Sequence, residues 1–223
     1  MLPAVKLSVR GSLHAGINAS RKETASVVEI TAEFVVVGWF MTDFTGSNTP
    51  ADKRDLWRTP QAIFSALDAE FCFQLDAAAA PHNALCRRFI TEEQNTLVTP
   101  WADYMSIPGH VWINPPYSDI MPFVMKAAAE SKNQIGTVML VPSDTSVGWF
   151  REAIQTTSEV RFITSGRLAF ISPVTGKPVS GNNKGSMLLI WRPYPRTQCD
   201  FTTVERDVLI EFGIARLARR EAA

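Results

Sequence analysis

The run Asn114-Pro115-Pro116-Tyr117 restricts the fold of this 223-residue chain more than any other feature of its sequence. Directly before it, residues 111–113 are β-branched or aromatic and follow the turn signal Pro108-Gly109, a pattern that predicts a short buried strand. Two consecutive prolines cannot continue a strand, because neither has an N–H group to donate. Asn114 is therefore predicted at the carboxyl end of a strand, the edge at which open α/β sheets bind ligands.

Predicted strands and helices alternate through the middle of the chain. They are a helix after the N-cap residue Thr59 with Pro60 at its first position, strands over 71–75, 137–141 and 160–164, and helices over 122–131 and 148–153. Residues 137–141 are continuously apolar, as in strands inside a parallel sheet. The alternation predicts an α/β fold with a mostly parallel sheet.

The C-terminal third of the sequence adds two features. Residues 168–171 and 186–191 are expected to pair as an antiparallel C-terminal hairpin at the edge of the sheet. Thr202 and Glu205 have the spacing of a capping box at the start of a helix. The expected parts are an N-terminal extension over 1–50, whose structure the sequence leaves open, a main domain over 51–195 and a C-terminal helix over 196–223.

Composition narrows the classes of function. The 22 basic and 22 acidic residues balance, which argues against a non-specific nucleic-acid coat protein, although a local patch can still bind DNA. The three cysteines and three histidines are scattered without the spacing of a metal site or a disulfide framework, so we expect no metal. We also expect a cytoplasmic protein without membrane contact, because no apolar run is long enough to span a bilayer.

The four residues of the first motif suit the recognition of a flat amino-bearing group. An exocyclic amino group on a base is a poor nucleophile, because its lone pair is delocalised into the ring. The Asn114 side-chain oxygen and the Pro115 carbonyl can accept its hydrogens and localise that lone pair. Tyr117 can stack on the base, a contact worth about 1–3 kcal/mol. The predicted catalytic set is Asn114, Pro115, Pro116 and Tyr117.

Three motifs in this order resemble the phage and prophage Dam-type DNA adenine-N6 methyltransferases. They are Trp57-Arg-Thr-Pro60, Phe73-Gln-Leu-Asp-Ala-Ala78 and Asn114-Pro-Pro-Tyr-Ser118, and the resemblance covers roughly residues 52–192. It implies an abridged Rossmann-like methyltransferase fold with S-adenosylmethionine as the methyl donor. The implied reaction methylates adenine N6 in double-stranded DNA at a short site, with GATC as the best guess, after the base has flipped out of the helix.

The resemblance also implies the cofactor site. Asp76 would be its acidic residue, while Ala77 and Ala78 stand where many methyltransferases have glycines. Glu92 or Glu93 is a candidate for binding the ribose. The implied cofactor-binding residues are Trp57, Thr59, Pro60, Asp76, Ala77 and Ala78. The segment that reads the DNA is expected within 172–185 or 92–105.

Several alternatives remain open at this point. Protein-glutamine methyltransferases also use an NPPY motif, and cytosine-N4 enzymes more often carry serine where Asn114 stands. The Ala77-Ala78 pair would also suit a catalytically inactive DNA-binding relative. The resemblance favours an enzyme that is a monomer when free, is encoded by a phage or prophage, and protects phage DNA in the bacterial host cell.

Overall fold

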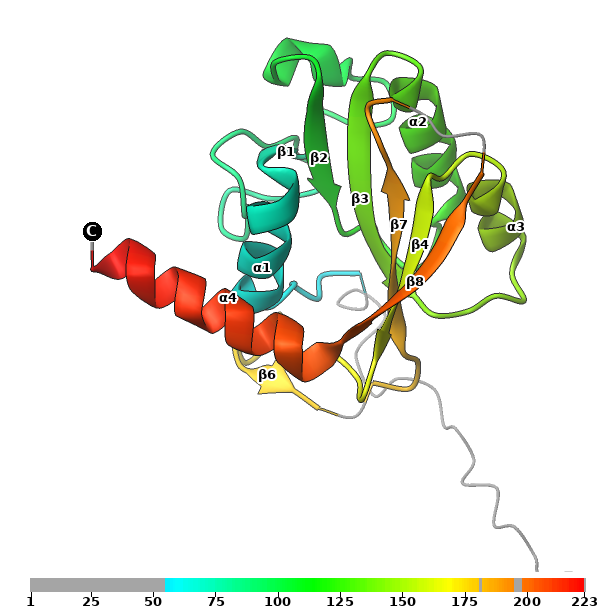
Figure 1. Ribbon diagram of the computed structural model, residues 1–223. Coiled ribbons are helices and arrows are strands. Elements are labelled where there is room, and N and C mark those ends of the chain that lie inside the picture. Colours follow the sequence, from blue (N-terminus) through cyan, green and yellow to red (C-terminus); the bar gives the residue numbers. More distant parts are fainter. Residues whose placement is uncertain (1–54, 181, 195–197, 223) are drawn as a thin grey trace, which may run out of the picture. The chain divides into compact units, whose positions relative to one another are not determined.

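Residues 55–180, 182–194 and 198–222 are described in the computed structural model of the protein (Figure 1). The extension predicted over 1–50 lies outside these residues, so its fold stays a prediction. All described residues belong to one unit of the chain, Asp43–Ala223. Of the helices between residues 55 and 222, none combines the length and the apolar character that a membrane-spanning helix needs.

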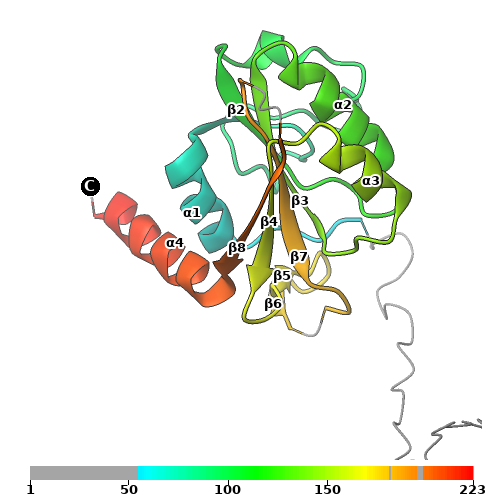
Figure 2. The same cartoon turned by 45° about the vertical axis from the view of Figure 1, so that its right-hand side comes forward.

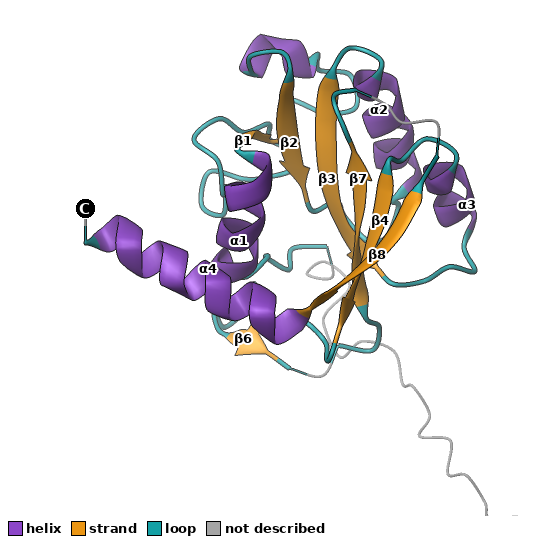
Figure 3. Cartoon of the chain, viewed as in Figure 1, coloured by secondary structure: helices purple, strands orange, loops and turns teal. Residues whose placement is uncertain are grey.

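A six-stranded sheet forms the centre of the fold, in the order β1-β2-β3-β7-β4-β8 (Figure 3). Its strands are β1 (Phe73–Asp76), β2 (Gly109–Ile113), β3 (Ile135–Pro142), β4 (Glu159–Thr164), β7 (Ser186–Trp191) and β8 (Asp200–Glu205). β1, β2 and β3 are parallel neighbours, as are β4 and β8, whereas β7 is antiparallel to both β3 and β4. The predicted α/β fold with a mostly parallel sheet is confirmed.

The antiparallel strands pair differently from the detailed expectation. β5 (Phe170–Ile171) pairs with β6 (Pro178–Val179) in a separate antiparallel hairpin. The predicted antiparallel hairpin is therefore present, but residues 186–191 were the wrong partner. Those residues form β7, which lies inside the sheet between β3 and β4 rather than at an edge. All six residues of β7 are buried. A strand this apolar is stable only with neighbours on both sides and helices over both faces.

Helices cover both faces of the sheet. α1 (Gln61–Phe71) and α4 (Arg206–Glu221) lie on one face, and α2 (Met121–Ser131) and α3 (Gly148–Ile154) lie on the other (Figures 1 and 2). Successive side chains of a strand point to opposite faces. Trp112 accordingly joins the core under α1, while Val111 and Ile113 join the core under α2. This double cover holds β2 rigidly and fixes the position of the motif that follows it.

The C-terminal segment begins as a strand and not as a helix. β8 runs through Thr202 and Glu205, and α4 starts only at Arg206, so the predicted capping box does not form. Parallel pairing with β4 satisfies the backbone of β8, and the Thr202 hydroxyl donates to Glu159 Oε1 at 2.7 Å. The helix then crosses α1 at Gly213, where any side chain would collide with the backbone of Ala62.

Candidate active site

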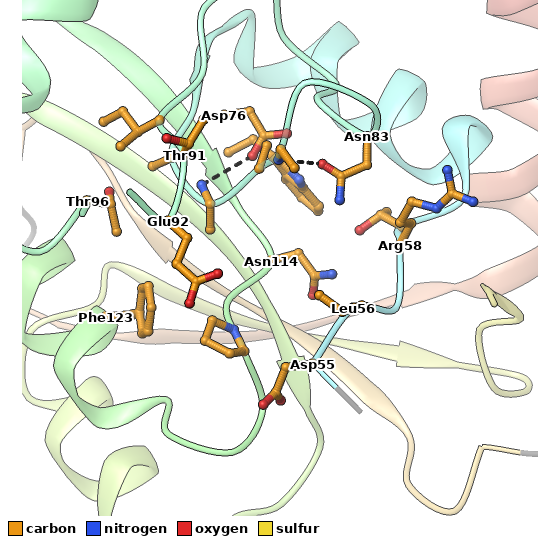
Figure 4. A pocket seen from close by; sticks show the side chains of 18 of the residues that line it. Asp55, Leu56, Arg58, Asp76, Asn83, Thr91, Glu92, Thr96, Asn114 and Phe123 are labelled. Atoms are coloured by element: carbon orange, nitrogen blue, oxygen red, sulfur yellow. Dashed lines mark hydrogen bonds between the residues drawn. The ribbon is translucent and has the colours of Figure 1, made fainter. Parts of the chain in front are cut away.

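The carboxyl ends of β1 and β2 open into a cavity of about 620 Å³ (Figure 4). This volume lies within the range of about 300–1,000 Å³ that is usual for small-molecule sites. Because β1 and β2 are parallel neighbours, Asp76 at the end of one strand and Asn114 after the other reach the same edge. The predicted site residues in the cavity wall are Trp57, Thr59, Asp76, Ala77, Ala78, Asn114 and Pro116.

Asn114 has an amide held in one orientation. Its Nδ2 donates to the Trp57 carbonyl oxygen at 3.2 Å, across 57 positions of sequence. Its Oδ1 is buried, and none of the residues that the structure describes donates to it. A buried acceptor without a partner costs about 1–3 kcal/mol. The amide therefore presents a desolvated acceptor that a ligand N–H group would satisfy.

The segment 55–59 forms one wall of this cavity, and we call it the front segment. Arg58 exchanges both backbone hydrogen bonds with Ile171, at 3.1 and 2.9 Å, which ties the front segment to β5. Trp57 supplies the carbonyl that orients Asn114. The motif that begins at Trp57 and the motif that begins at Asn114 are far apart in the sequence. They are nevertheless in direct contact, through a backbone carbonyl of one and a side chain of the other.

Asp76 is the buried acidic group of the cavity, with 3% of its surface exposed. Burial raises the pKa of its carboxyl from 3.8 to about 6, against the lowering effect of hydrogen bonds from the backbone N–H groups of Leu85 and Ala78. Those bonds measure 3.0 Å for Leu85 and 3.5 Å for Ala78. Close to neutral pH this carboxylate is charged, buried and only partly compensated, so the site is suited to a cationic ligand.

The loop after β1 consists of small residues fixed by hydrogen bonds. Ala77 is fully buried, and its N–H donates to the Trp112 carbonyl at 2.9 Å. The Ala79 N–H donates to the Ile90 carbonyl at 3.2 Å, and Asn83 Oδ1 accepts from the Ala80 N–H at 2.7 Å. The alanine run therefore lines the cavity with backbone and methyl groups, in a conformation that needs no glycine.

Thr59 is a cavity residue and not a helix cap. Pro60 occupies the N-cap position of α1 without a side-chain cap, so the predicted capping role of Thr59 and the predicted helical position of Pro60 were wrong. The Thr59 hydroxyl oxygen is buried and has no hydrogen-bond partner among the described residues. Pro60 is not among the described residues that line the cavity.

The remaining residues of the first motif differ in position. Pro116 lines the cavity, whereas Pro115 is buried and Tyr117 packs edge to face on Phe170, with ring centroids 6.3 Å apart. The Tyr117 hydroxyl is buried without a partner in the described part of the chain, and this burial raises the pKa of the phenol above its ordinary value. The stacking role of Tyr117 stays a prediction.

The loop 95–99 lies within the segment 92–105 that was considered for reading DNA, but its contribution to the cavity wall was not predicted. Asn95, Thr96 and Leu97 line the cavity, as does Phe123 of α2. A buried hydrogen bond holds this loop in place: Trp101 Nε1 donates to Thr96 Oγ1 at 2.8 Å. No local sequence pattern predicts that these residues line the cavity, because their position depends on contacts between segments that are far apart in the sequence.

Lys126 of α2 secures the same loop. Its ammonium group donates to the Thr99 carbonyl at 2.9 Å, pairs with Glu130 at 2.6 Å and lies 5.5 Å from the centre of the Trp101 ring. These contacts keep the loop against α2 and hold its cavity-lining residues in place.

Of the two ribose candidates, Glu92 lines the cavity, and Figure 4 shows its carboxylate extending toward the space beside Asn114. Glu93 is exposed and is not among the described lining residues. Among the described residues, no group of three or more His, Cys, Asp or Glu side chains is arranged to hold a metal ion.

A family model described as DNA N-6-adenine-methyltransferase (Dam) matches residues 46–215. The chain is 41% identical over 164 residues to a DNA N-6-adenine-methyltransferase of Escherichia phage T1, which covers 67% of both chains. It is 39% identical over 152 residues to a DNA N-6-adenine-methyltransferase of Haemophilus phage HP1 (strain HP1c1), which covers 67% of this chain and 85% of the relative. The residues matched by the family model include every predicted site residue.

Proposed function

The chain belongs to the DNA N-6-adenine-methyltransferase (Dam) family, which confirms the resemblance of its motifs, and we propose that its catalytic site is the cavity between the front segment and residues 114–118. The enzyme is an adenine-specific DNA methyltransferase. One observation carries the assignment of the site: Asn114 Oδ1 is a buried acceptor in the cavity wall without a partner among the described residues.

The acceptor side recognises the adenine amino group. Asn114 Oδ1 and the Pro115 carbonyl accept the two N6 hydrogens and draw the lone pair out of the ring. An amide oxygen does this without charge, so its strength does not vary with pH. Tyr117 stays neutral because the pKa of its phenol is raised, and we propose that it offers an aromatic face for the flipped base.

The donor side has the properties that S-adenosylmethionine requires. This cofactor carries an ammonium group, a sulfonium group and a ribose, and supplies an electrophilic methyl group when it is bound. Asp76 is a buried carboxylate suited to the cation, and the unpartnered Thr59 hydroxyl is a further polar contact. Glu92 is proposed for the ribose hydroxyls. Trp57, Ala77 and Ala78 complete the cavity wall on the proposed donor side. Pro60 follows Thr59 but is outside the described lining, so its cofactor contact stays a prediction.

Positioning and electrostatics supply the catalysis in this proposal. The N6–CH₃ bond forms as the methyl group leaves sulfur, and no covalent bond to the protein is needed. The rigid end of β2 fixes Asn114, and the Trp57 carbonyl prevents its amide from turning over.

DNA recognition is proposed for the segment 172–185, which includes the turn of the β5–β6 hairpin. Arg58, a cavity residue, lies against Gly176 of this turn, since a Cβ there would be 3.9 Å from its guanidinium group. The turn presents Val174 and Lys177 to solvent. The segment 92–105 is the second candidate, because its first residues line the cavity. GATC remains the proposed target, and a monomer acting on phage DNA in the bacterial cell remains the proposed form.

Expression in a host without DNA methylation tests the function. One sample of the host DNA is digested to nucleosides and analysed by mass spectrometry. A second, intact sample is mapped by long-read sequencing. We expect N6-methyladenine at one short site. N4-methylcytosine would support the cytosine alternative. Methylated glutamine on a host protein would support the protein alternative. Absence of any product, together with no heat of binding for S-adenosylmethionine in calorimetry, would support the inactive relative.

A further inference from the structure

The loop 114–118 is held at both ends by the front segment. At one end, Asn114 Nδ2 donates to the Trp57 carbonyl at 3.2 Å. At the other end, the Ser118 N–H donates to Asp55 Oδ1 at 3.0 Å, across 63 positions of sequence. Pro115 and Pro116 between these ends have no N–H group, so the loop can make no backbone donor contact at either position. Hydrogen bonds that orient the loop therefore come from its two ends and act together with the packing of Pro115 and Tyr117.

The two end contacts differ in what supplies the acceptor. Trp57 uses a backbone carbonyl, which no side-chain substitution removes, whereas Asp55 uses a carboxylate oxygen. A hydrogen bond to a charged acceptor is stronger than a neutral one. We propose that Asp55 is a positioning residue for methyl transfer, which fixes the loop 114–118 through Ser118 so that the Asn114 acceptor faces the adenine amino group. This inference rests on the catalytic role proposed for Asn114.

The location of Asp55 separates this role from a general role in folding. Its side chain is exposed at the cavity wall and belongs to neither hydrophobic core. The paired Arg58–Ile171 hydrogen bonds use backbone groups alone, so they should hold the front segment when Asp55 is changed. Asp76 of the donor side lies at the end of a different strand. Loss of the Asp55 contact should therefore reduce the rate of transfer and leave donor affinity and folding nearly unchanged.

Three substitutions separate the position of the acceptor from its charge. Asp55→Asn keeps an oxygen at the same place and loses the charge, whereas Asp55→Glu keeps the charge and moves the oxygen by one methylene. Asp55→Ala removes both. We expect kcat to fall about 10- to 100-fold in Asp55→Ala, in the range of small misplacements of reacting groups. Asp55→Asn should stay within about threefold of the wild type, with Asp55→Glu between the two.

The measurements are initial rates on unmethylated genomic DNA, calorimetric affinity for S-adenosylmethionine, and melting temperature. Asp119→Ala is the matched control, because Asp119 is an exposed acidic residue directly after the loop 114–118 and outside the cavity wall. We expect wild-type kinetics for this control, and donor affinities within about twofold for all four variants.

Three outcomes would overturn the inference. They are wild-type kcat in Asp55→Ala, a higher kcat in Asp55→Glu than in Asp55→Asn, or a loss of activity that follows a loss of melting temperature in all three variants. Retained activity in Asn114→Ala would instead reject the proposed catalytic site itself. The two failures are therefore distinguishable.

Discussion

The two proposed sides of the cavity depend on different interactions, geometry on one side and charge on the other. The acceptor side, formed by the loop 114–118 with its contacts to the Trp57 carbonyl and Asp55, depends on geometry, because one backbone carbonyl orients one amide. The donor side, at the end of β1, depends on charge, because it contains a buried carboxylate with a pKa of about 6. A change of geometry should therefore act on the rate of transfer, and a change of charge should act on donor affinity.

The largest expected effect is on the acceptor side. Asn114→Ala removes the unpartnered acceptor and should lower kcat about 10²- to 10³-fold, by analogy with the loss of one oriented polar group that stabilises a transition state. Donor affinity by calorimetry should change less than about threefold. Asn133→Ala, at an exposed position after α2, is the control. A loss of donor affinity as large as the loss of kcat would break the division between the two sides.

The donor side should respond to removal of its charge. Asp76→Asn keeps the shape of the side chain and should weaken S-adenosylmethionine binding about 10- to 100-fold, the range for a hydrogen-bonded charge pair. The kcat at saturating donor should fall much less than in Asn114→Ala. Calorimetry and saturation kinetics together measure both quantities, and an unchanged dissociation constant would remove Asp76 from the donor site.

Acidity should lower donor affinity through Asp76. The wild-type donor affinity should fall about tenfold per pH unit below pH 6, as Asp76 takes up a proton. In Asp76→Asn this slope should disappear. The same raised pKa affects stability, because the native carboxyl binds its proton more tightly than the unfolded one with a pKa near 3.8. Its contribution to stability is present below about pH 4 and is lost as the pH rises through about 6.

The smallest expected effect concerns Thr59, where ligand binding and stability should change in opposite directions. Thr59→Val removes a buried hydroxyl without a described partner and should raise the free energy of unfolding by about 1 kcal/mol. Donor affinity should fall about threefold to tenfold, because the hydroxyl is a proposed contact of the cofactor. Denaturant unfolding and calorimetry measure the two effects. A destabilised variant with unchanged donor affinity would contradict both expectations.

The sequence predicted the parts of the site that short-range rules control. Two prolines end a strand wherever it lies, so Asn114 was correctly predicted at the end of β2. A strand ending at Asp76 was predicted in the same way, and parallel pairing brings the two residues to one edge. These rules act within a few residues and do not depend on the remainder of the fold.

Parts that depend on distant contacts could not be predicted. The capping signals at Thr59 and Thr202 are local, but β8 pairs with β4 and Thr59 turns into the cavity, so tertiary contacts override both signals. The position of β7 between β3 and β4 is likewise a property of the whole sheet. The contact of Trp57 with Asn114 joins segments that no sequence pattern pairs.

The central claim is that the amide of Asn114 in this cavity drives methylation of adenine N6. The most direct test is the N6-methyladenine content of DNA from a methylation-deficient host that expresses either the wild-type chain or a folded Asn114→Ala variant. The account predicts abundant N6-methyladenine at one short site with the wild type. With the variant at limiting expression, it predicts an N6-methyladenine content lower by at least about a hundredfold. Equal methylation by the two proteins at limiting expression would contradict it.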